Sequence, residues 1–277
     1  MTIRHCAPAK INICLHVLKH REDGLHQIES LVTFLDCGEW ITLSKANETE
    51  LNIVGPQAKK LPVSENNLIL RATRLFPSRC TSKITLHKSM PIAAGIGGGS
   101  ADAAATLKAM AKVWELPVPN VSSQLQLGAD VPVCMHSKPV LMQGVGEVIS
   151  PVLNFPELFC CLVNPGVAIK TEDIFKKLIK KNNAPMNSFP KNEKGWRNWF
   201  DEHRNDLEQP ATLIQPVINI VLKQLKQWNP ILARMSGSGA TCFALFETLD
   251  QAKRCSKMIS KQNPKWWTVA GRMLGQY

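Results

Sequence analysis

A glycine-rich run leads directly into an alanine-rich stretch at residues 90–107, MPIAAGIGGGSADAAATL. Alanine has the highest helix propensity, Ser100 can cap a helix, and Asp102 suits the positive end of its dipole, so the sequence predicts a helix from Ser100 that ends before Pro117. Glycines placed just before a helix leave backbone N–H groups open at that positive end, where a phosphate can bind. The alternative interpretation is a flexible linker, but linkers are polar and Ser-rich, whereas this loop lies between apolar segments.

Two common phosphate motifs do not match this loop. A P-loop needs a Gly-Lys pair, and no such pair follows these glycines. A dinucleotide fingerprint matches only in part, as Gly95-x-Gly97-x-x-Ser100, because the third glycine is missing. The loop is therefore expected to bind phosphate in a third way.

Composition and length are those of a globular protein with more than one domain. The chain has 277 residues, of which 44% are hydrophobic and 20% charged, and about 150 residues per domain suggests two domains. The amino-terminal segment is interrupted by Lys10, Asn12 and His16, so no secretion signal or membrane helix is expected. The nine cysteines show no C-x-x-C pair or metal spacing, which predicts reduced thiols in a cytoplasmic protein.

The charge favours an anionic partner without identifying it. A formal net charge of +11 suits either a nucleic acid or a phosphorylated small molecule. The chain has a single tyrosine and no aromatic platform of the RNP type. RNA binding remains the alternative from a different functional class.

The first half is expected to form a mixed sheet with helices. In residues 10–19 the apolar side chains alternate with Lys10, Asn12, Cys14 and His16, which predicts a strand with one apolar face. Asp23-Gly24 predicts a turn. Further strands are expected at 27–36, 39–46, 50–55 and 83–90, a helix at 66–76, and, within 122–149, a short helix closed by Gly128 followed by a strand hairpin.

The second half predicts a separate α+β domain with a sheet covered on one side by helices. The boundary is placed between residues 154 and 155. Strands are expected at 158–166, 231–236, 240–247 and 266–271, helices from 171, at 210–225 and at 249–260, and a basic loop at 181–196. A second glycine loop, SGSG at 236–239, precedes a strand; it is either a tight turn or part of a phosphate site.

These segments resemble the GHMP kinases, because PIAAGIGGGSADAAATL looks like their ATP loop. A further set of segments is similar to one branch of that superfamily, the kinases of a cytidine diphosphate-linked methylerythritol. These segments occur in family order from residue 7 to about 246. They are GGGSADAA, APAKINICLHVLKHREDGLHQIES, LGADVPVCM, GVGE, NPGVAIKTEDIF, NDLE and MSGSGATCFALF.

The resemblance implies a two-domain α+β fold. Its N-terminal ATP-binding half (1–154) would be like ribosomal protein S5 domain 2, and its C-terminal half (155–277) ferredoxin-like. It also implies ATP- and Mg²⁺-dependent phosphorylation of that substrate's 2-hydroxyl, in the non-mevalonate route to isoprenoid precursors, by a monomer or homodimer without nucleic-acid or membrane partners. A GHMP kinase for another small alcohol is the nearer alternative.

The resemblance assigns catalysis to Asp130 and Lys10. Asp130 would be the general base, and Lys10, placed beside it in the family, would keep it ionised and stabilise the transferred phosphoryl group. Apolar neighbours raise the pKa of a carboxylate unless a cation offsets them, which gives this pairing a physical reason. The alternatives are a turn or helix-capping aspartate and a solvated strand lysine.

Binding residues carry over in the same way. Asn12 would contact substrate, His26 would bond the cytosine edge, and Phe175, preceded by Thr171, would stack on the base. Leu25 stands where the family pattern has tyrosine, so one aromatic wall is missing. Ser100 is a candidate indirect Mg²⁺ ligand, and no carboxylate pair is assigned to the metal. The predicted ATP residues are Asn67, Lys88, Pro91, Ile92, Ala93, Ala94, Gly95, Ile96, Gly97, Gly98, Gly99, Ser100 and Ala101.

Overall fold

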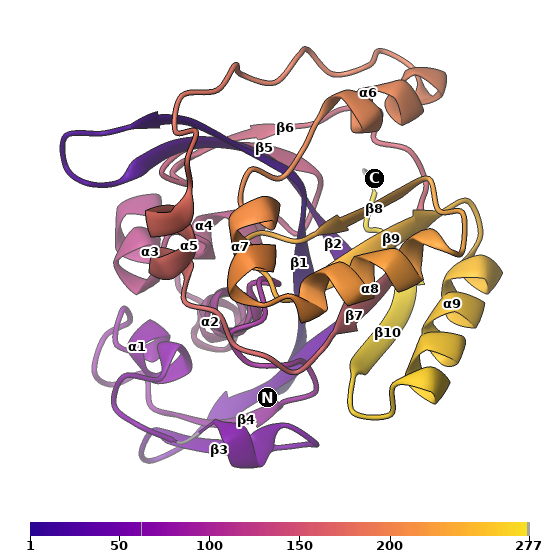
Figure 1. Ribbon diagram of the computed structural model, residues 1–277. Helices are drawn as coiled ribbons and strands as arrows, with labels where there is room; N and C mark the ends of the chain where they lie inside the picture. Colours follow the sequence, from indigo (N-terminus) through magenta and orange to yellow (C-terminus); the bar gives the residue numbers. More distant parts are fainter. Residues whose placement is uncertain (62, 276–277) are drawn as a thin grey trace. The chain divides into compact units, whose positions relative to one another are not determined.

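The computed structural model describes residues 1–61 and 63–275. The chain, drawn as a ribbon in Figure 1, forms two compact units. Unit 1 contains residues 1–9, 38–92 and 97–136, and unit 2 contains residues 10–37, 93–96 and 137–277. Two long paired strands, β1 (Thr2–His20) and β2 (His26–Lys45), contribute residues to both units. The predicted boundary after residue 154 stays a prediction.

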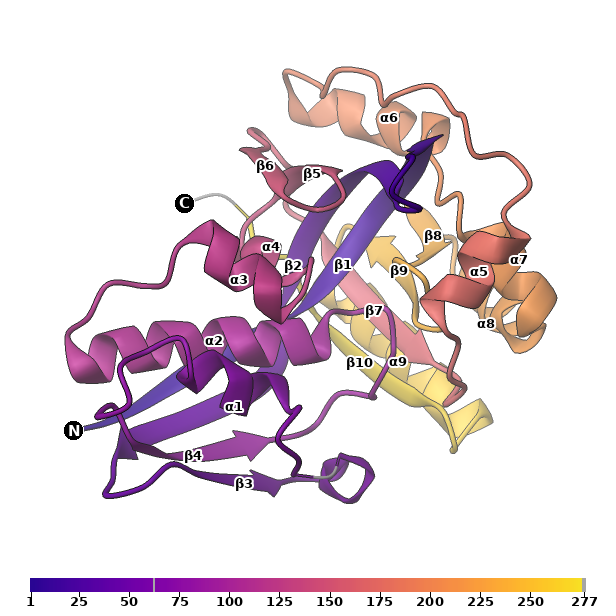
Figure 2. The ribbon, with the colours of Figure 1, turned by 90° about the vertical axis from the view of Figure 1, so that its left-hand side faces the viewer.

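Unit 1 combines a small sheet with a central helix. The carboxyl-terminal part of β2 pairs antiparallel with β4 (Ser82–His87), which pairs in parallel with β3 (Glu50–Val54). Helix α2 (Gly98–Trp114) packs against α1 (Leu68–Thr73) and α4 (Val131–His136) (Figure 2). Every alanine of α2 is buried, so its small side chains allow close packing. The remaining elements are η1 (Ala58–Lys60) and α3 (Val121–Leu127).

Unit 2 is built around an antiparallel four-stranded sheet. Its order is β10 (Trp267–Arg272), β7 (Phe159–Asn164), β9 (Cys242–Phe246) and β8 (Leu232–Met235). Helices α8 (Val217–Lys226) and α9 (Leu249–Gln262) pack on this sheet and bury one apolar core with it (Figure 1). The unit also contains the hairpin of β5 (Val140–Gly144) and β6 (Val148–Pro151), α5 (Thr171–Lys177), η2 (Glu193–Gly195), α6 (Trp196–Glu202) and α7 (Glu208–Ile214).

The α+β class predicted from the sequence is confirmed, with several corrections to its elements. Strand β2 is continuous, where separate strands were expected at 27–36 and 39–46. Gly38 does not break it; an added Cβ would lie 2.2 Å from the Ala7 carbonyl oxygen, so this glycine permits close approach of β1. The expected helix at 210–225 is two helices separated at Gln215 and Pro216. Helices α4 and α6 were not predicted.

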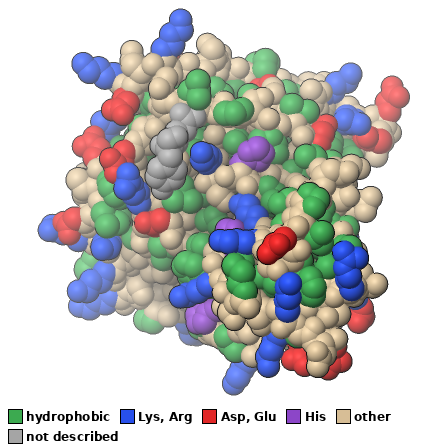
Figure 3. All heavy atoms as spheres, turned by 180° about the vertical axis from the view of Figure 1, so that it is seen from behind, with side chains coloured by type: hydrophobic (Ala, Val, Ile, Leu, Met, Phe, Trp, Pro, Cys, Tyr) green, Lys and Arg blue, Asp and Glu red, His purple; other side chains and the backbone are tan. Residues whose placement is uncertain are grey.

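All nine cysteines are free, and most are buried. No helix in the described ranges is long and apolar enough to cross a membrane. On the face shown in Figure 3, Lys and Arg side chains are spread out, with Asp and Glu side chains among them.

Candidate functional site

The amino end of α2 in unit 1 has no side-chain cap. The helix begins at Gly98, and the preceding Gly97 has a left-handed φ of 64°. The prediction that Ser100 caps the helix is wrong, because Ser100 lies in its first turn. The N–H group of Ala101 donates to the Gly97 carbonyl at 2.8 Å, so the three N–H groups before it lack helical acceptors. A 17-residue helix thus presents open donors at its positive end, which suits a phosphate.

A buried ionic triad fixes this helix end to the end of β4. Lys88 Nζ lies 2.6 Å from Glu39 Oε2 and 3.0 Å from Asp102 Oδ2, and all three side chains are at most 3% exposed. The other Glu39 oxygen accepts the N–H groups of Ser89 and Met90. Burial raises the pKa of Asp102 well above its ordinary value; Lys88 opposes this shift and Glu39 adds to it. Lys88 therefore has structural partners here, and its predicted adenine contact stays a prediction.

Two further predicted residues of unit 1 stand at helix starts. Asn67 is the N-cap of α1, and its Oδ1 accepts the Ile69 N–H group at 2.9 Å. Asp130 directly precedes α4, and its carbonyl oxygen accepts the Cys134 N–H group at 3.2 Å. Asp130 thus stands at a helix start, the position expected in the alternative interpretation of a helix-capping aspartate. Its role as a base stays a prediction, as does its pairing with Lys10, which belongs to unit 2.

In unit 2, the polar face of β1 is as buried as its apolar face. Lys10 and Asn12 are 4% and 1% exposed. The Lys10 N–H group donates to the Ile96 carbonyl at 3.0 Å, and the Asn12 N–H group donates to Ser236 Oγ at 3.1 Å. Asn12 Nδ2 donates to Ser30 Oγ, whereas Asn12 Oδ1 is buried without a hydrogen-bond partner among the described residues. A buried, unpaired acceptor is costly unless a ligand satisfies it.

The two glycine loops meet backbone to backbone beside Asn12. An added Cβ on Gly95 would lie 2.5 Å from the Ser236 carbonyl oxygen, and one on Gly237 would lie 2.9 Å from Asn12 Oδ1. Ser236 Oγ also donates to the Gly95 carbonyl at 3.0 Å. Glycine is required at these close approaches. The sequence identified both loops as candidates, but their contact emerges only from the fold.

The tip of the β1–β2 hairpin brings His26 to Phe175 of α5. Their rings stack with centroids 4.4 Å apart and planes at 22°. Burial lowers the pKa of His26, with added effects of His20 and Lys181, so the ring is held neutral. His26 Nε2 is buried without a partner in the part of the chain that is described. Leu25 beside it is 51% exposed.

Thr171 is placed at the other glycine loop. As the first residue of α5, it donates its hydroxyl proton to Ser238 Oγ at 2.9 Å. The structure thus brings the four predicted substrate-binding residues, all in unit 2, into two groups: Asn12 and Thr171 at loop 236–239, and His26 with Phe175 at the hairpin tip.

The basic loop at 181–196 covers part of β1. Burial lowers the pKa of His16 to about 4, so its ring is neutral. Its Nδ1 donates to the Ala184 carbonyl at 3.3 Å, and its Nε2 accepts the Arg204 N–H group at 3.4 Å. This histidine therefore serves as a structural bridge between the loop and the chain after α6.

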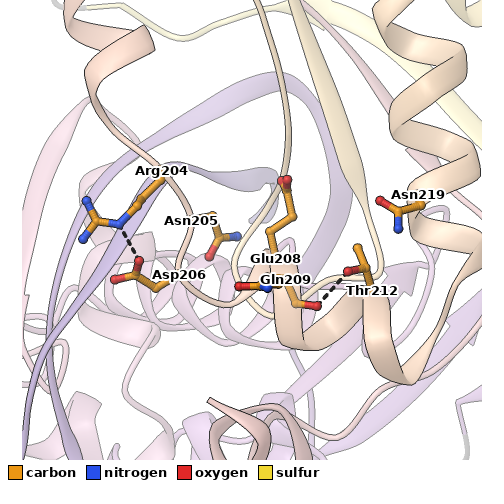
Figure 4. A pocket seen from close by; sticks show the side chains of 7 residues that line it. All are labelled: Arg204, Asn205, Asp206, Glu208, Gln209, Thr212 and Asn219. Atoms are coloured by element: carbon orange, nitrogen blue, oxygen red, sulfur yellow. Dashed lines mark hydrogen bonds and ion pairs between the residues drawn. The ribbon is translucent and has the colours of Figure 1, made fainter. Parts of the chain in front are cut away.

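No individual role was predicted from the sequence for the residues that line the pocket in Figure 4. This pocket, of about 460 Å³, lies beside loop 236–239 and is lined by Arg204, Asn205, Asp206, Glu208, Gln209, Thr212 and Asn219. Asn205 to Glu208 form the NDLE segment, which was noted only as part of a resemblance. Apart from that resemblance, the local signal was the concentration of polar residues at 204–206 and 208–209.

Comparison with known proteins shows the family of the chain. The family model for the GHMP kinases N terminal domain matches residues 67–140, and that for the GHMP kinases C terminal matches residues 192–265. A 4-diphosphocytidyl-2-C-methyl-D-erythritol kinase from Ruegeria pomeroyi is 46% identical over 99% of this chain and 100% of its own length. The enzyme of that name from Cereibacter sphaeroides is 44% identical, with 97% and 98% covered.

Solved structures show the same fold. The crystal structure of a 4-(cytidine 5'-diphospho)-2C-methyl-D-erythritol kinase superposes with a TM-score of 0.83 at 26% identity, covering 99% of this chain and 100% of the other. Homoserine kinase from Cytophaga hutchinsonii superposes with a TM-score of 0.67 at 16% identity, covering 99% and 96%. The similarity to the homoserine kinase concerns the fold alone.

Proposed function

The chain belongs to the 4-diphosphocytidyl-2-C-methyl-D-erythritol kinase family of the GHMP kinases, and we propose that it transfers the γ-phosphoryl group of ATP to the 2-hydroxyl of 4-diphosphocytidyl-2-C-methyl-D-erythritol. The reaction belongs to the non-mevalonate route to isoprenoid precursors. The observation that carries the proposal is the meeting of two glycine loops at Asn12, whose Oδ1 is buried and unpaired among the described residues.

The residues present fit ATP. The open N–H groups at the start of α2 would hold phosphate oxygens, and residues 91–101 would surround them. Asn67 and Lys88 would lie near the adenine. ATP supplies the phosphoryl group, and the helix end contributes fixed dipoles that stabilise negative charge without reorganising.

Mg²⁺ is proposed to be held chiefly by phosphate oxygens. No group of three His, Cys, Asp or Glu residues that could hold a metal occurs within residues 1–61 and 63–275. Mg²⁺ commonly binds through substrate phosphates with few protein ligands, and the Ser100 hydroxyl in the first turn of α2 would be an indirect one. The ion would neutralise phosphate charge.

Phosphoryl transfer also needs a proton acceptor and positive charge at the moving group. Asp130 would accept the proton of the substrate hydroxyl. Lys10 would keep that carboxylate ionised and stabilise the phosphoryl group during transfer. The net charge of +11 would attract both anionic substrates at long range.

The cytosine would bind at the hairpin tip. The unpaired Nε2 of a neutral His26 would bond the base edge, and Phe175 would stack on its ring. Because these two rings now stack on each other, they must separate for both to contact the same base.

Leu25→Tyr is expected to tighten binding of the cytidyl substrate by up to about tenfold, since an aromatic pair adds up to about 1.4 kcal/mol. The exposed Leu25 position leaves room for the larger ring. Phe175→Ala is expected to weaken binding, because no second aromatic wall shares the stacking. Dissociation and Michaelis constants for the substrate measure both effects, and ATP affinity should not change.

Leu153→Tyr is the matched control, because Leu153 is likewise exposed, at 64%, and no role is assigned to it. If substrate affinity responds to neither Leu25→Tyr nor Phe175→Ala, the base binds elsewhere or the substrate carries no cytosine.

The function itself is tested by ATP consumption with three acceptors: the cytidyl substrate, homoserine and mevalonate. Turnover is expected with the first alone. Turnover with homoserine or mevalonate instead would make the protein a kinase of another small alcohol. Tight RNA binding without any kinase activity would support the nucleic-acid alternative.

A further inference from the structure

Asn205, in the pocket of Figure 4, is bonded to the start of the glycine loop through its side-chain NH2 group. Asn205 is 5% exposed, and its Nδ2 donates to the carbonyl oxygens of Met235 and Gly237, each at 2.8 Å. Its Oδ1 accepts the Leu207 N–H group at 3.0 Å. Both hydrogens of the amide are therefore directed to the start of loop 236–239.

Glu208 holds the same loop from a second direction. Its Oε2 accepts the Met235 N–H group at 2.7 Å, so Met235 has both its carbonyl and its N–H group bonded to residues of one segment. That segment is itself fixed to β1, because the Asp206 N–H group donates to the Leu15 carbonyl at 2.8 Å and Asp206 Oδ2 accepts the Val17 N–H group at 2.7 Å.

These bonds determine which way one peptide group of the loop faces. In a trans peptide the carbonyl and the following N–H group point in opposite directions. Because Asn205 holds the Gly237 carbonyl, the Ser238 N–H group must point away from Asn205. Gly237 has a left-handed φ of 54°, which glycine adopts without strain, so the hydrogen bonds of the loop, and not steric restriction, select the orientation of this peptide group.

We propose that Asn205 is a positioning residue for phosphoryl transfer, which orients the Gly237–Ser238 peptide so that its N–H group faces the phosphates of the reactants. Glu208 supports it by holding Met235. The inference rests on the proposed function, because it takes loop 236–239 to be the segment that contacts those phosphates.

The test is Asn205→Asp, which keeps the shape and the acceptor for Leu207 but places an oxygen against two carbonyl oxygens. At about pH 8 we expect kcat to fall at least about tenfold, with ATP affinity within about twofold of the wild type. Lowering the pH should restore part of the activity relative to the wild type. A buried carboxyl facing carbonyls has a raised pKa, and its protonated form can donate one hydrogen bond.

Asn219→Asp is the matched control, because it makes the same chemical change at an exposed residue of the same pocket. It should leave kcat unchanged at every pH. Wild-type kcat in Asn205→Asp, or a loss that is the same at all pH values, would overturn the proposal. A wild-type protein that does not phosphorylate the cytidyl substrate would instead refute the proposed function.

A second pair of variants applies if Asn205→Asp does not fold. Glu208→Leu removes the acceptor for the Met235 N–H group. It should lower kcat by a larger factor than it changes KM. Glu208→Gln retains an oxygen acceptor and should recover most of the activity. Equal activity of Glu208→Leu and the wild type would contradict the proposal.

Discussion

Replacing Asp130 with Asn is expected to lower kcat on the order of 100-fold or more, because an amide can neither accept the hydroxyl proton nor supply negative charge. Dissociation constants for ATP and for the cytidyl substrate should stay close to those of the wild type. Single-turnover kinetics and calorimetry measure the two effects separately.

The substitution also separates catalysis from helix capping. Asp130 directly precedes α4, and Asn is as good an N-cap as Asp, so a purely capping role predicts unchanged stability and unchanged kcat. Asp250→Asn is the control, because Asp250 lies in the first turn of α9 and its ion pair with Arg254 is exposed. Near wild-type turnover in Asp130→Asn would remove Asp130 from the mechanism.

Lys10→Met serves as the companion variant. Met is similar in length but uncharged, and Lys10 is 4% exposed, so the change removes a buried positive charge while the volume is nearly kept. A loss of kcat comparable to that of Asp130→Asn is expected if the two act as a unit. Undiminished kcat would leave Lys10 with a structural role only.

The second large effect is expected for Gly97→Val. ATP affinity should fall on the order of 100-fold or more, equivalent to about 3 kcal/mol. A β-branched side chain at a φ of 64° is strained, and it would stand at the helix end where the phosphates are proposed to bind. Titration calorimetry with ATP measures the affinity.

Gly24→Val controls for backbone strain. Gly24 has a φ of 82° in the exposed turn between β1 and β2, and an added Cβ there meets nothing within 4 Å. It should cost stability of about 1–2 kcal/mol, as in any left-handed position, with ATP affinity unchanged. A folded Gly97→Val protein that binds ATP normally would show that the loop does not hold the phosphates.

The helix after the glycine loop could be predicted because the signal is local. Alanine propensity alone identifies most of α2, although the start was placed at Ser100 instead of Gly98. Because glycine has a low helix propensity, the sequence predicts that the helix begins after the glycines and is capped by Ser100, the first serine that follows them. In the structure Gly98 already belongs to the helix, and an added Cβ there would be in ordinary van der Waals contact with Lys88 Nζ at 3.4 Å.

The burial of polar groups could not be predicted in the same way. Alternation in residues 10–19 indicates a strand, but Asn12 is covered by Ser236, 224 residues further along the chain. Asn205 likewise donates to the carbonyl oxygen of Met235, 30 residues away, and no periodicity encodes that contact. Long-range hydrogen bonds of this kind determine the candidate site, whereas local patterns determine only the elements that carry it.

The triad of Lys88, Glu39 and Asp102 bears on the electrostatics of nucleotide binding. Two ionised carboxylates around one ammonium group would leave a surplus negative charge beneath the helix end, and this charge would repel a polyphosphate. Because the pKa of Asp102 is raised, its carboxyl retains a proton more readily than an ordinary aspartate. In that form the three side chains are together electrically neutral, so the helix end is anchored without losing its attraction for anions.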